Sequence, residues 1–458
     1  RRRVRQRALP LLLECSVRCV AAASNGPARH GGSLAMLSVP KRYDEEDIGS
    51  PSWAAHNRHF FILSSAGKPI FARFGDESKL AGLAGVLQAL VSVIAGSGDK
   101  LRHMRSGAHT AAFLTRGPVY LVAVSSGGDS VSYLMRQLNC MHAQIISILT
   151  SKIEDIFVRN ASYDLRSLLG GTDRVLRHLI HAGSREVSFL VKAVPTLRLL
   201  PADRAEIGKL LASHRPPELL FAVLLGREQL VQLLHPKKRP LHPVDLLLIR
   251  NAVISTSSFR EGESWLPICL PRYNQRAFVY AHVSFVGREM PLVLISASRD
   301  AFAALSAARA QVMDGLRARG MLAAAIERAI AAPLPDASEP GVAEVQHFIC
   351  KQREHQQCTH ALWGTHTSST CPYRQHAAIK KLLTRYQLAH ARVHATRKPL
   401  RELYLASDSE VIISRCTPEY ELYIVFGPLV TKPIADAACN RVLKWVKREE
   451  RALFLGPG

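Results

Sequence analysis

The chain has 458 residues, of which 47% are hydrophobic, so it is too long for one ordinary core and predicts about three domains. Sixty Lys and Arg against 37 Asp and Glu give a net charge of +23, which predicts an anionic partner without choosing between nucleic acid, an acidic membrane surface and an acidic protein. Nine scattered cysteines lack the density of a disulfide scaffold and favour a reducing, cytosolic compartment.

Residues 1–55 mix Arg, Gly, Ser and Pro without sustained periodicity, which predicts a flexible basic segment. The first residues also imitate a targeting peptide, with a basic start, an apolar middle and small residues behind. Glu14 and Arg18 interrupt that apolar middle. A targeting segment and a disordered basic tail are the two alternatives, and the interruption favours the tail.

Residues 59–75, HFFILSSAGKPIFARFG, place two apolar runs around a Gly-Lys pair. A phosphate-binding loop would need a Gly five residues before Gly67 and a Ser or Thr after Lys68, but Ile62 and Pro69 stand there. The stretch therefore predicts a β-hairpin whose turn contains Gly67.

The next segment, DESKLAGLAGVLQALVSVIAG, predicts a helix that Asp76 or Ser78 can cap. Leucines recur along it at three-four spacing, and the opposite side carries Ala and Gly instead of charges. The helix therefore needs cover on both faces: a sheet on one, and on the other either a partner protein or another element of the same chain. The candidate interface residues are Leu80, Leu83, Ala84, Val86, Leu87 and Leu90.

The charge-free stretch at 80–95 is shorter than the roughly 18–20 residues that a transmembrane helix needs, so no membrane span is predicted. Any membrane contact is then peripheral.

A similar order of strands and helices recurs from about residue 219 and again from about residue 345. It predicts three α+β units, each a small antiparallel sheet with flanking helices. The predicted divisions are a flexible segment at 1–55, a first domain at 56–160, a helical connector at 161–216, a second domain at 217–329, a Pro-rich linker at 330–342 and a third domain at 343–458.

No hydrolase elbow, His-Glu-x-x-His helix, dinucleotide glycine fingerprint or strand-end carboxylate pair occurs in the sequence. We therefore predict no catalytic residue and no cofactor, and an enzyme without a recognisable motif is a minor alternative.

Cysteine and histidine residues cluster in one probable loop region, but their spacing fits no standard zinc pattern. With 19 His in the chain, chance clustering is the favoured interpretation and no metal is predicted. The members of this cluster are Cys350, His355, Cys358, His360, His366 and Cys371.

Lys237, Lys238 and Arg239 form a basic turn between two His-Pro pairs. Anionic lipid headgroups attract such a turn with roughly 1 kcal/mol per basic side chain, which makes it the candidate membrane-binding site. Nucleic acid ranks lower because surface aromatic residues are not interleaved with the basic clusters. For each basic cluster taken alone, the alternative to a binding site is an ordinary solvated surface.

The charged turn SFREGESW at 258–265 could be a partner contact or a salt-bridged loop that packs under its neighbours. Of these two interpretations, packing is favoured.

Six stretches, in this order, resemble the vacuolar fusion protein family called Mon-one or SAND protein, over residues 56 to about 456. They are HFFILSSAGKPIFARFG, YDLRSLLGG, HPVDLLLIRN, SSFREGESWLPICLPRYN, RKPLRELY and LKWVKREERALF. Residues 1–55 and 350–376 do not resemble the family pattern.

The resemblance implies three longin-type domains and pairing through the first of them with a Ccz-one-type longin subunit. It implies a heterodimeric guanine-nucleotide exchange factor for the late-endosomal Rab GTPase, Rab seven, with no covalent catalysis. Recruitment to endosomal or vacuolar membranes by phosphoinositide and by the active early-endosomal Rab is also implied. The alternatives are a trafficking scaffold without exchange activity and, at lower weight, a nucleic-acid binder.

Overall fold

The computed structural model describes residues 46–456 apart from residue 49 and residues 160–168, 170–171, 319–320, 364–372 and 374. Most of the predicted flexible segment, residues 1–45, lies outside the described residues. The chain divides into two compact units, 1–181 and 182–458.

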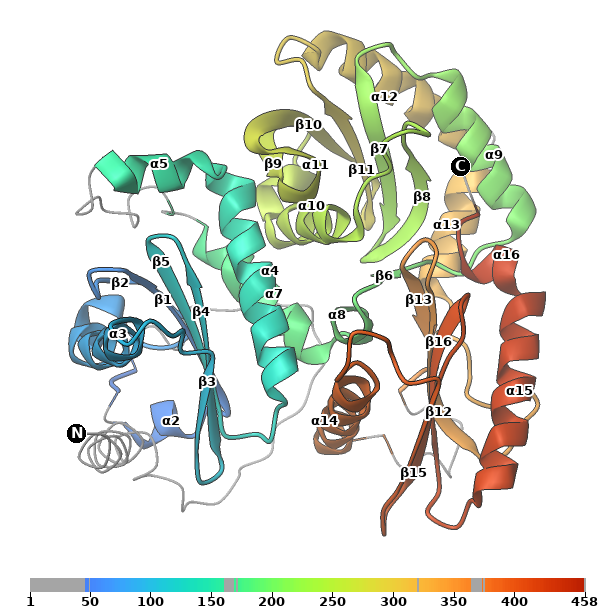
Figure 1. Ribbon diagram of the computed structural model, residues 1–458. Coiled ribbons are helices and arrows are strands. Elements are labelled where there is room, and N and C mark those ends of the chain that lie inside the picture. The colour runs from blue at the N-terminus through green and yellow to red at the C-terminus, as the bar shows by residue number, and fades with distance from the viewer. Residues whose placement is uncertain are drawn as a thin grey trace. The chain divides into compact units, whose positions relative to one another are not determined.

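The first unit contains a five-stranded antiparallel sheet in the order β2-β1-β5-β4-β3 (Figure 1). Its strands are β1 (Arg58–Ser64), β2 (Pro69–Ala72), β3 (His103–Ser106), β4 (His109–Arg116) and β5 (Val119–Ser125).

The predicted hairpin at 59–75 is confirmed, because β1 and β2 pair antiparallel. Gly67 has a φ of +79°, which glycine adopts without steric cost, and its N–H donates to the Ser64 carbonyl. An added Cβ at Gly67 would also lie 3.3 Å from the side chain of Gln88. The Gly-Lys pair is therefore part of a turn that the following helix approaches closely.

Two long helices lie on opposite faces of this sheet (Figure 1). On one face, η1 (Glu77–Leu80) leads into α3 (Ala81–Ala95), and on the other α4 (Val131–Leu149) packs against β4 and β5. The predicted apolar stripe of α4 is buried at Leu134, Leu138, Met141 and Ile145. Shorter helices precede and follow this core: α2 (Pro51–Ala54), α5 (Lys152–Arg159) and α7 (Asp173–Arg185).

A buried ion pair fastens the first strand to the loop before α4. The Nε and Nη2 atoms of Arg58 donate to the two carboxylate oxygens of Asp129 at 2.6 and 2.5 Å. Ser125 Oγ donates to the same carboxylate at 2.6 Å. Asp129 is only 3% exposed, so its negative charge is stabilised by these protein partners and not by water.

The second sheet has the order β8-β7-β11-β10-β9. Helix α10 (Pro243–Ser255) packs on one of its faces, and α9 (Pro201–Ser213), α12 (Phe302–Ala318) and α13 (Met321–Ala331) pack on the other. Short η2 (Ser257–Arg260) and α11 (Pro271–Asn274) complete the domain. The strands are β7 (Leu219–Gly226), β8 (Gln229–Leu234), β9 (Ser264–Leu270), β10 (Gln275–Gly287) and β11 (Met290–Ser296).

The third sheet has the order β14-β15-β16-β12-β13-β6. Helix α15 (Lys432–Arg448) packs on one face through Val442 and Trp445, and α14 (His376–Val393) lies against β14 and β15. The chain ends after α16 (Glu450–Leu453). The strands are β12 (Val345–Gln352), β13 (Gln357–His360), β14 (Glu402–Ala406), β15 (Val411–Cys416), β16 (Tyr420–Phe426) and β6 (Val194–Pro195).

The three domains share one order of elements: a hairpin, a helix, three antiparallel strands and a further helix. This confirms the predicted α+β class with three small sheets and flanking helices. The sequence patterns did not predict β3 and β13, each of which is only four residues long. In β3, exposed and half-buried residues alternate, and not every half-buried position carries a long apolar side chain.

The segment before the second domain joins the second and third sheets. After α8 (Val187–Val191), strand β6 pairs in parallel with β13, and the Leu197 N–H donates to the carbonyl of Leu230 in β8. The buried guanidinium of Arg204 on α9 donates to the carbonyls of Val231, Leu197 and Ala452 at 2.7–3.0 Å. The second and third domains are therefore connected by backbone hydrogen bonds as well as by side-chain packing.

A second buried arginine lies between two glutamates in this unit. Arg250 of α10 donates to the carboxylate of Glu186 and, at 3.2 Å, to the carbonyl oxygen of Glu228. Burial and the neighbouring Glu186 carboxylate raise the pKa of Glu228 to about 7. Burial alone would also raise the pKa of Glu186, but Arg250 lowers it overall.

We expect this raised pKa to make the stability of the second unit depend on pH. The folded protein binds the Glu228 proton more tightly than the unfolded chain does, so the free energy of unfolding falls as pH rises from about 4.5 to about 7 and stays lower above. The substitution Glu228→Gln keeps a hydrogen-bond donor but removes the titration. It should therefore stabilise the protein more at pH 8 than at pH 5, by roughly 1–2 kcal/mol after allowing for partial exposure.

Urea unfolding at the two pH values measures this difference. Glu218→Gln, at an exposed position ahead of β7, is the matched control and should change stability equally at both pH values. Equal stabilisation by Glu228→Gln at pH 5 and pH 8 would contradict the prediction.

Candidate functional site

The helical segment of the first domain begins at a capped turn. The Asp76 carboxylate accepts from the Ser78 N–H at 2.8 Å, as the sequence predicted for one of its two candidate caps. Glu77 Oε1 accepts from the Ala72 N–H at 3.0 Å and thereby ties the start of the helix to β2. From Ala81 to Ala95 the helix carries no charged residue.

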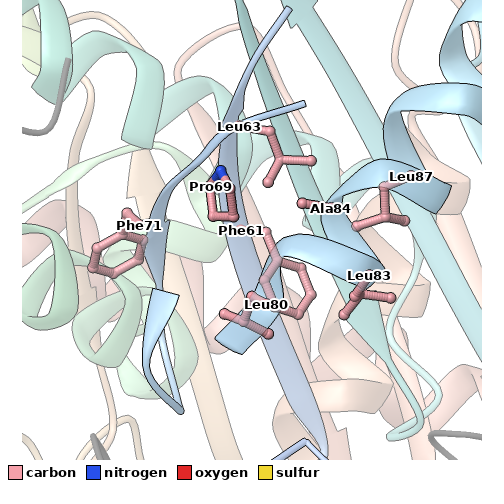
Figure 2. A pocket seen from close by; sticks show the side chains of 8 residues that line it. All are labelled: Phe61, Leu63, Pro69, Phe71, Leu80, Leu83, Ala84 and Leu87. Atoms are coloured by element: carbon pink, nitrogen blue, oxygen red, sulfur yellow. The ribbon is translucent and has the colours of Figure 1, made fainter. Parts of the chain in front are cut away.

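One face of this segment packs on the hairpin sheet. Figure 2 shows Leu80, Leu83, Ala84 and Leu87 beside Phe61 and other residues of the hairpin. The crevice between them is too narrow for a water molecule, so it is a packing contact within the domain core. The leucine stripe thus fixes the helix in place.

The six predicted interface residues divide into two groups. Leu80, Ala84 and Leu87 are buried in the core of the first domain. They cannot touch a partner directly while the helix stays packed, because the sheet already covers them. Leu83, Val86 and Leu90 are half-buried and lie at the margins of the helix. A partner contact through these three margin positions stays a prediction.

The opposite face of α3 is exposed, and we call it the outer face. Val93 is 63% exposed, and a Cβ added at Gly82 or Gly85 would meet no atom within 4 Å. Small residues of this kind let another backbone approach closely. The outer face consists of Ala81, Gly82, Gly85, Ala89, Ser92 and Val93, all exposed.

The helical run Glu77–Ala95 has 19 residues, and its most apolar 18-residue window has a mean hydropathy of 1.6, so by length and composition alone it could cross a membrane. The absence of a membrane span stays a prediction, because the run reaches this length only when the charged residues Glu77 and Lys79 of the 3-10 turn are included. Only 22% of its most apolar window is buried. In the structure its inner face packs on a sheet, and the feature that needs explaining is its uncovered outer face.

The predicted basic turn lies between β8 and α10. Lys237, Lys238 and Arg239 are all exposed, and a turn bond from the Arg239 N–H to the Pro236 carbonyl shapes it. None of the three forms an ion pair with another residue that the structure describes. Their charges are therefore available to an anionic surface.

The two described cysteines of the Cys/His cluster do not face one common site. Cys350 lies opposite Thr359, and Cys358 lies opposite Lys351, so the two thiols point to opposite faces of the sheet. Burial raises the pKa of the Cys358 thiol to about 12, which keeps the sulfur protonated. His366 and Cys371 lie outside the described residues.

The charged turn at 258–265 is packed within its own domain. The Glu263 carboxylate accepts hydrogen bonds from His282, Ser306 and Arg309, each at 2.7 Å. Trp265 packs against the core beneath α12. These contacts agree with the favoured interpretation of a salt-bridged loop, while Arg260 and Glu261 at its tip are exposed.

Sequence reasoning missed one cluster of metal-ligating side chains. His390 and His394 of the third domain lie with Glu421 so that one donor atom from each is within 4.8 Å of the others. The sequence did contain one signal for this cluster: the two histidines are four residues apart in a predicted helix, which places them on one face.

Comparison with known proteins identifies all three domains. Residues 58–179, 217–314 and 344–450 match family models described as the first, second and third longin domains of FUZ, MON1 and HPS1.

Similar proteins occur in animals and plants. "Vacuolar fusion protein MON1 homolog A" of Gallus gallus is 35% identical over 423 residues, which cover 91% of this chain and 75% of that protein. The protein of the same name in Homo sapiens is 35% identical over 417 residues, or 90% of this chain and 62% of that protein. "Vacuolar fusion protein MON1 homolog" of Arabidopsis thaliana is 34% identical over 443 residues, or 91% and 72%. The chain therefore belongs to the MON1 family of vacuolar fusion proteins and consists of three longin domains.

Proposed function

We propose that this protein acts in membrane trafficking as one subunit of a heterodimeric guanine-nucleotide exchange factor. The complex would activate the late-endosomal Rab GTPase, Rab seven, on endosomes and so drive early-to-late endosome maturation and fusion with the vacuole or lysosome. Membership of a family named for vacuolar fusion supports the trafficking role. The observation that carries the proposal further is the outer face of α3.

The outer face has the properties of a protein interface. The residues of the outer face are exposed, and the helix carries no charged residue from Ala81 to Ala95. The inner face of the helix packs on the sheet. A contiguous exposed apolar surface in a folded domain marks an interaction site more often than a solvated one. A Ccz-one-type longin subunit is the proposed occupant, and the exchange surface would be built where the two first longin domains meet.

Exchange of this type needs no covalent step. A complex that binds the nucleotide-free GTPase more tightly than the GDP-bound form weakens the hold on GDP by the same factor. Catalysis then rests on differential binding at an interface. The chain alone should be a poor catalyst, because it would supply only part of that interface.

Release of fluorescent GDP from the late-endosomal Rab tests the proposal. It would be measured with this chain alone, with the Ccz-one-type subunit added, and with both on liposomes carrying phosphoinositide and the active early-endosomal Rab. Strong acceleration only in the presence of the partner is the expected result. If a verified complex left GDP release unchanged for several endosomal Rabs, the protein would instead be a longin-type trafficking scaffold.

The basic turn at 237–239 is the proposed membrane contact. Replacing Lys237, Lys238 and Arg239 by Ala should weaken binding to anionic liposomes about 100-fold at low salt, because each charge contributes roughly 1 kcal/mol near such a surface. Added salt should reduce the difference by screening. Liposome flotation over a salt series measures it.

A matched variant removes the same charge from exposed positions elsewhere in the second domain. Arg288, Arg299 and Arg317 replaced by Ala should bind liposomes nearly as well as the wild type. Equal weakening in both triple variants would show that net charge, and not the turn, governs membrane binding.

A further inference from the structure

Three potential metal ligands meet in the third domain between α14 and the sheet. His390 and His394 lie one helical turn apart at the end of α14, so their imidazoles share one side of the helix. Both approach Glu421 of β16 from that side. The Glu421 Oε1 atom lies 2.8 Å from Nε2 of His394 and 3.7 Å from Nε2 of His390.

These separations suit a tetrahedral transition-metal ion. Zinc bonds of about 2.0–2.1 Å to nitrogen and oxygen place neighbouring ligand atoms roughly 3.3 Å apart at the tetrahedral angle. The two distances to Oε1 bracket that value, and all three donor atoms lie within 4.8 Å of one another. Small side-chain shifts would bring the three atoms onto one ion.

The surroundings hold two of the three ligands firmly. His390 and Glu421 are buried, and the Tyr423 hydroxyl donates to Glu421 Oε1. The His390 and Tyr423 rings stack with centroids 6.0 Å apart. His394 is exposed at the end of the helix, so an ion could enter from solvent and keep a water molecule as its fourth ligand.

We propose that His390, His394 and Glu421 form a binding site for one divalent transition-metal ion of the Zn²⁺ class. In the structure a proton on Nε2 of His394 can bridge to the Glu421 carboxylate, and the ion would replace that proton. Two imidazoles with one carboxylate favour Zn²⁺ over Mg²⁺ and Ca²⁺, which prefer oxygen ligands. The bound ion would link the end of α14 to β16 in the interior of the sheet.

One nearby charge opposes the ion. Lys351 of β12 lies in the cross-strand position opposite Glu421. Its ammonium group donates to the Val191 carbonyl at 2.7 Å, so it is held by a backbone acceptor outside the cluster. We therefore expect a site of moderate affinity, because this positive charge close to Glu421 opposes the binding of a cation.

The experiment uses the full chain, stripped with a chelator and dialysed against Zn²⁺, with bound metal measured by mass spectrometry. Visible absorption after Co²⁺ substitution reports the ligand geometry independently. We expect one ion to be lost in His394→Ala and in Glu421→Gln, with affinity reduced at least about tenfold, since even groups that only orient ligands contribute 10–100-fold.

Two histidine variants serve as controls. His376→Ala, at the exposed start of the same helix, and His355→Ala, in the predicted Cys/His cluster, should retain the ion. Because His394 is exposed, His394→Ala should fold even if a change at buried Glu421 does not. Wild-type affinity in His394→Ala, or no ion bound by the wild type at micromolar Zn²⁺, would overturn the proposal. Equal loss in His355→Ala would place the ion elsewhere and also overturn it.

Discussion

Replacing Ala89 by Glu is expected to weaken assembly with the Ccz-one-type subunit by a factor of about 100 or more. Ala89 lies on the outer face of α3, where a carboxylate would be buried against the partner without a counter-charge. An uncompensated buried charge costs about 3 kcal/mol or more, and each 1.4 kcal/mol is a tenfold change in affinity. The fold should persist, since the position is exposed and Glu favours helix.

Co-purification and equilibrium binding with the partner measure this loss, and GDP release should fall with it. Ala310→Glu is the matched control, because it places the same charge at an exposed position of α12 in the second domain. Unchanged partner binding in Ala89→Glu would remove the outer face from the interface. The exchange proposal would then need another surface.

Replacing Asp129 by Ala should destabilise the first domain by about 3–5 kcal/mol. The change leaves the Arg58 guanidinium buried without its carboxylate and also removes the acceptor for Ser125 Oγ. Breaking one side of a buried pair has this cost, since the remaining charge is neither solvated nor paired. Hydrogen–deuterium exchange of β1 and β5 peptides measures the loss locally, which suits a chain with several domains.

Two further variants separate the ion pair from general effects. Asp99→Ala, at an exposed loop position, should leave exchange of these strands unchanged. The double variant Arg58→Met with Asp129→Leu should recover much of the lost stability, because apolar residues of similar volume can replace a buried pair at little cost. Slow exchange in Asp129→Ala, as in the wild type, would show that the pair contributes little.

Sequence patterns predicted the repeated domain because each unit contains long apolar strands and helices with apolar residues at regular spacing. The β1–β2 hairpin and the stripe on α4 are determined by local chemistry, through Gly67 in the turn and leucines at three-four spacing. Strands β3 and β13 depend on pairing with a neighbour that is already in place. Strands of only four residues carry too little apolar pattern to be recognised alone.

The candidate sites differ in how much of their geometry is local. The spacing of the leucines predicted an apolar stripe on α3, with the alanines on the opposite side. In the structure, Ala84 is buried on the same face as Leu80 and Leu87. The exposed face could be defined only after the sheet was placed. The metal cluster needs a helix and a strand that are separated in sequence, so the His390 and His394 spacing could not reveal Glu421.

The parallel pairing of β6 with β13 imposes an order in time on the synthesis of the protein. Val194 pairs with Gln357, so 163 residues separate the two strands. At roughly 5–20 residues per second, the ribosome needs about 8–33 s to make that interval. Strand β6 must therefore wait, without its partner in the third sheet, while the whole second domain emerges. A nascent chain that stalls in this interval would carry a finished second sheet and an open strand, which chaperones could recognise.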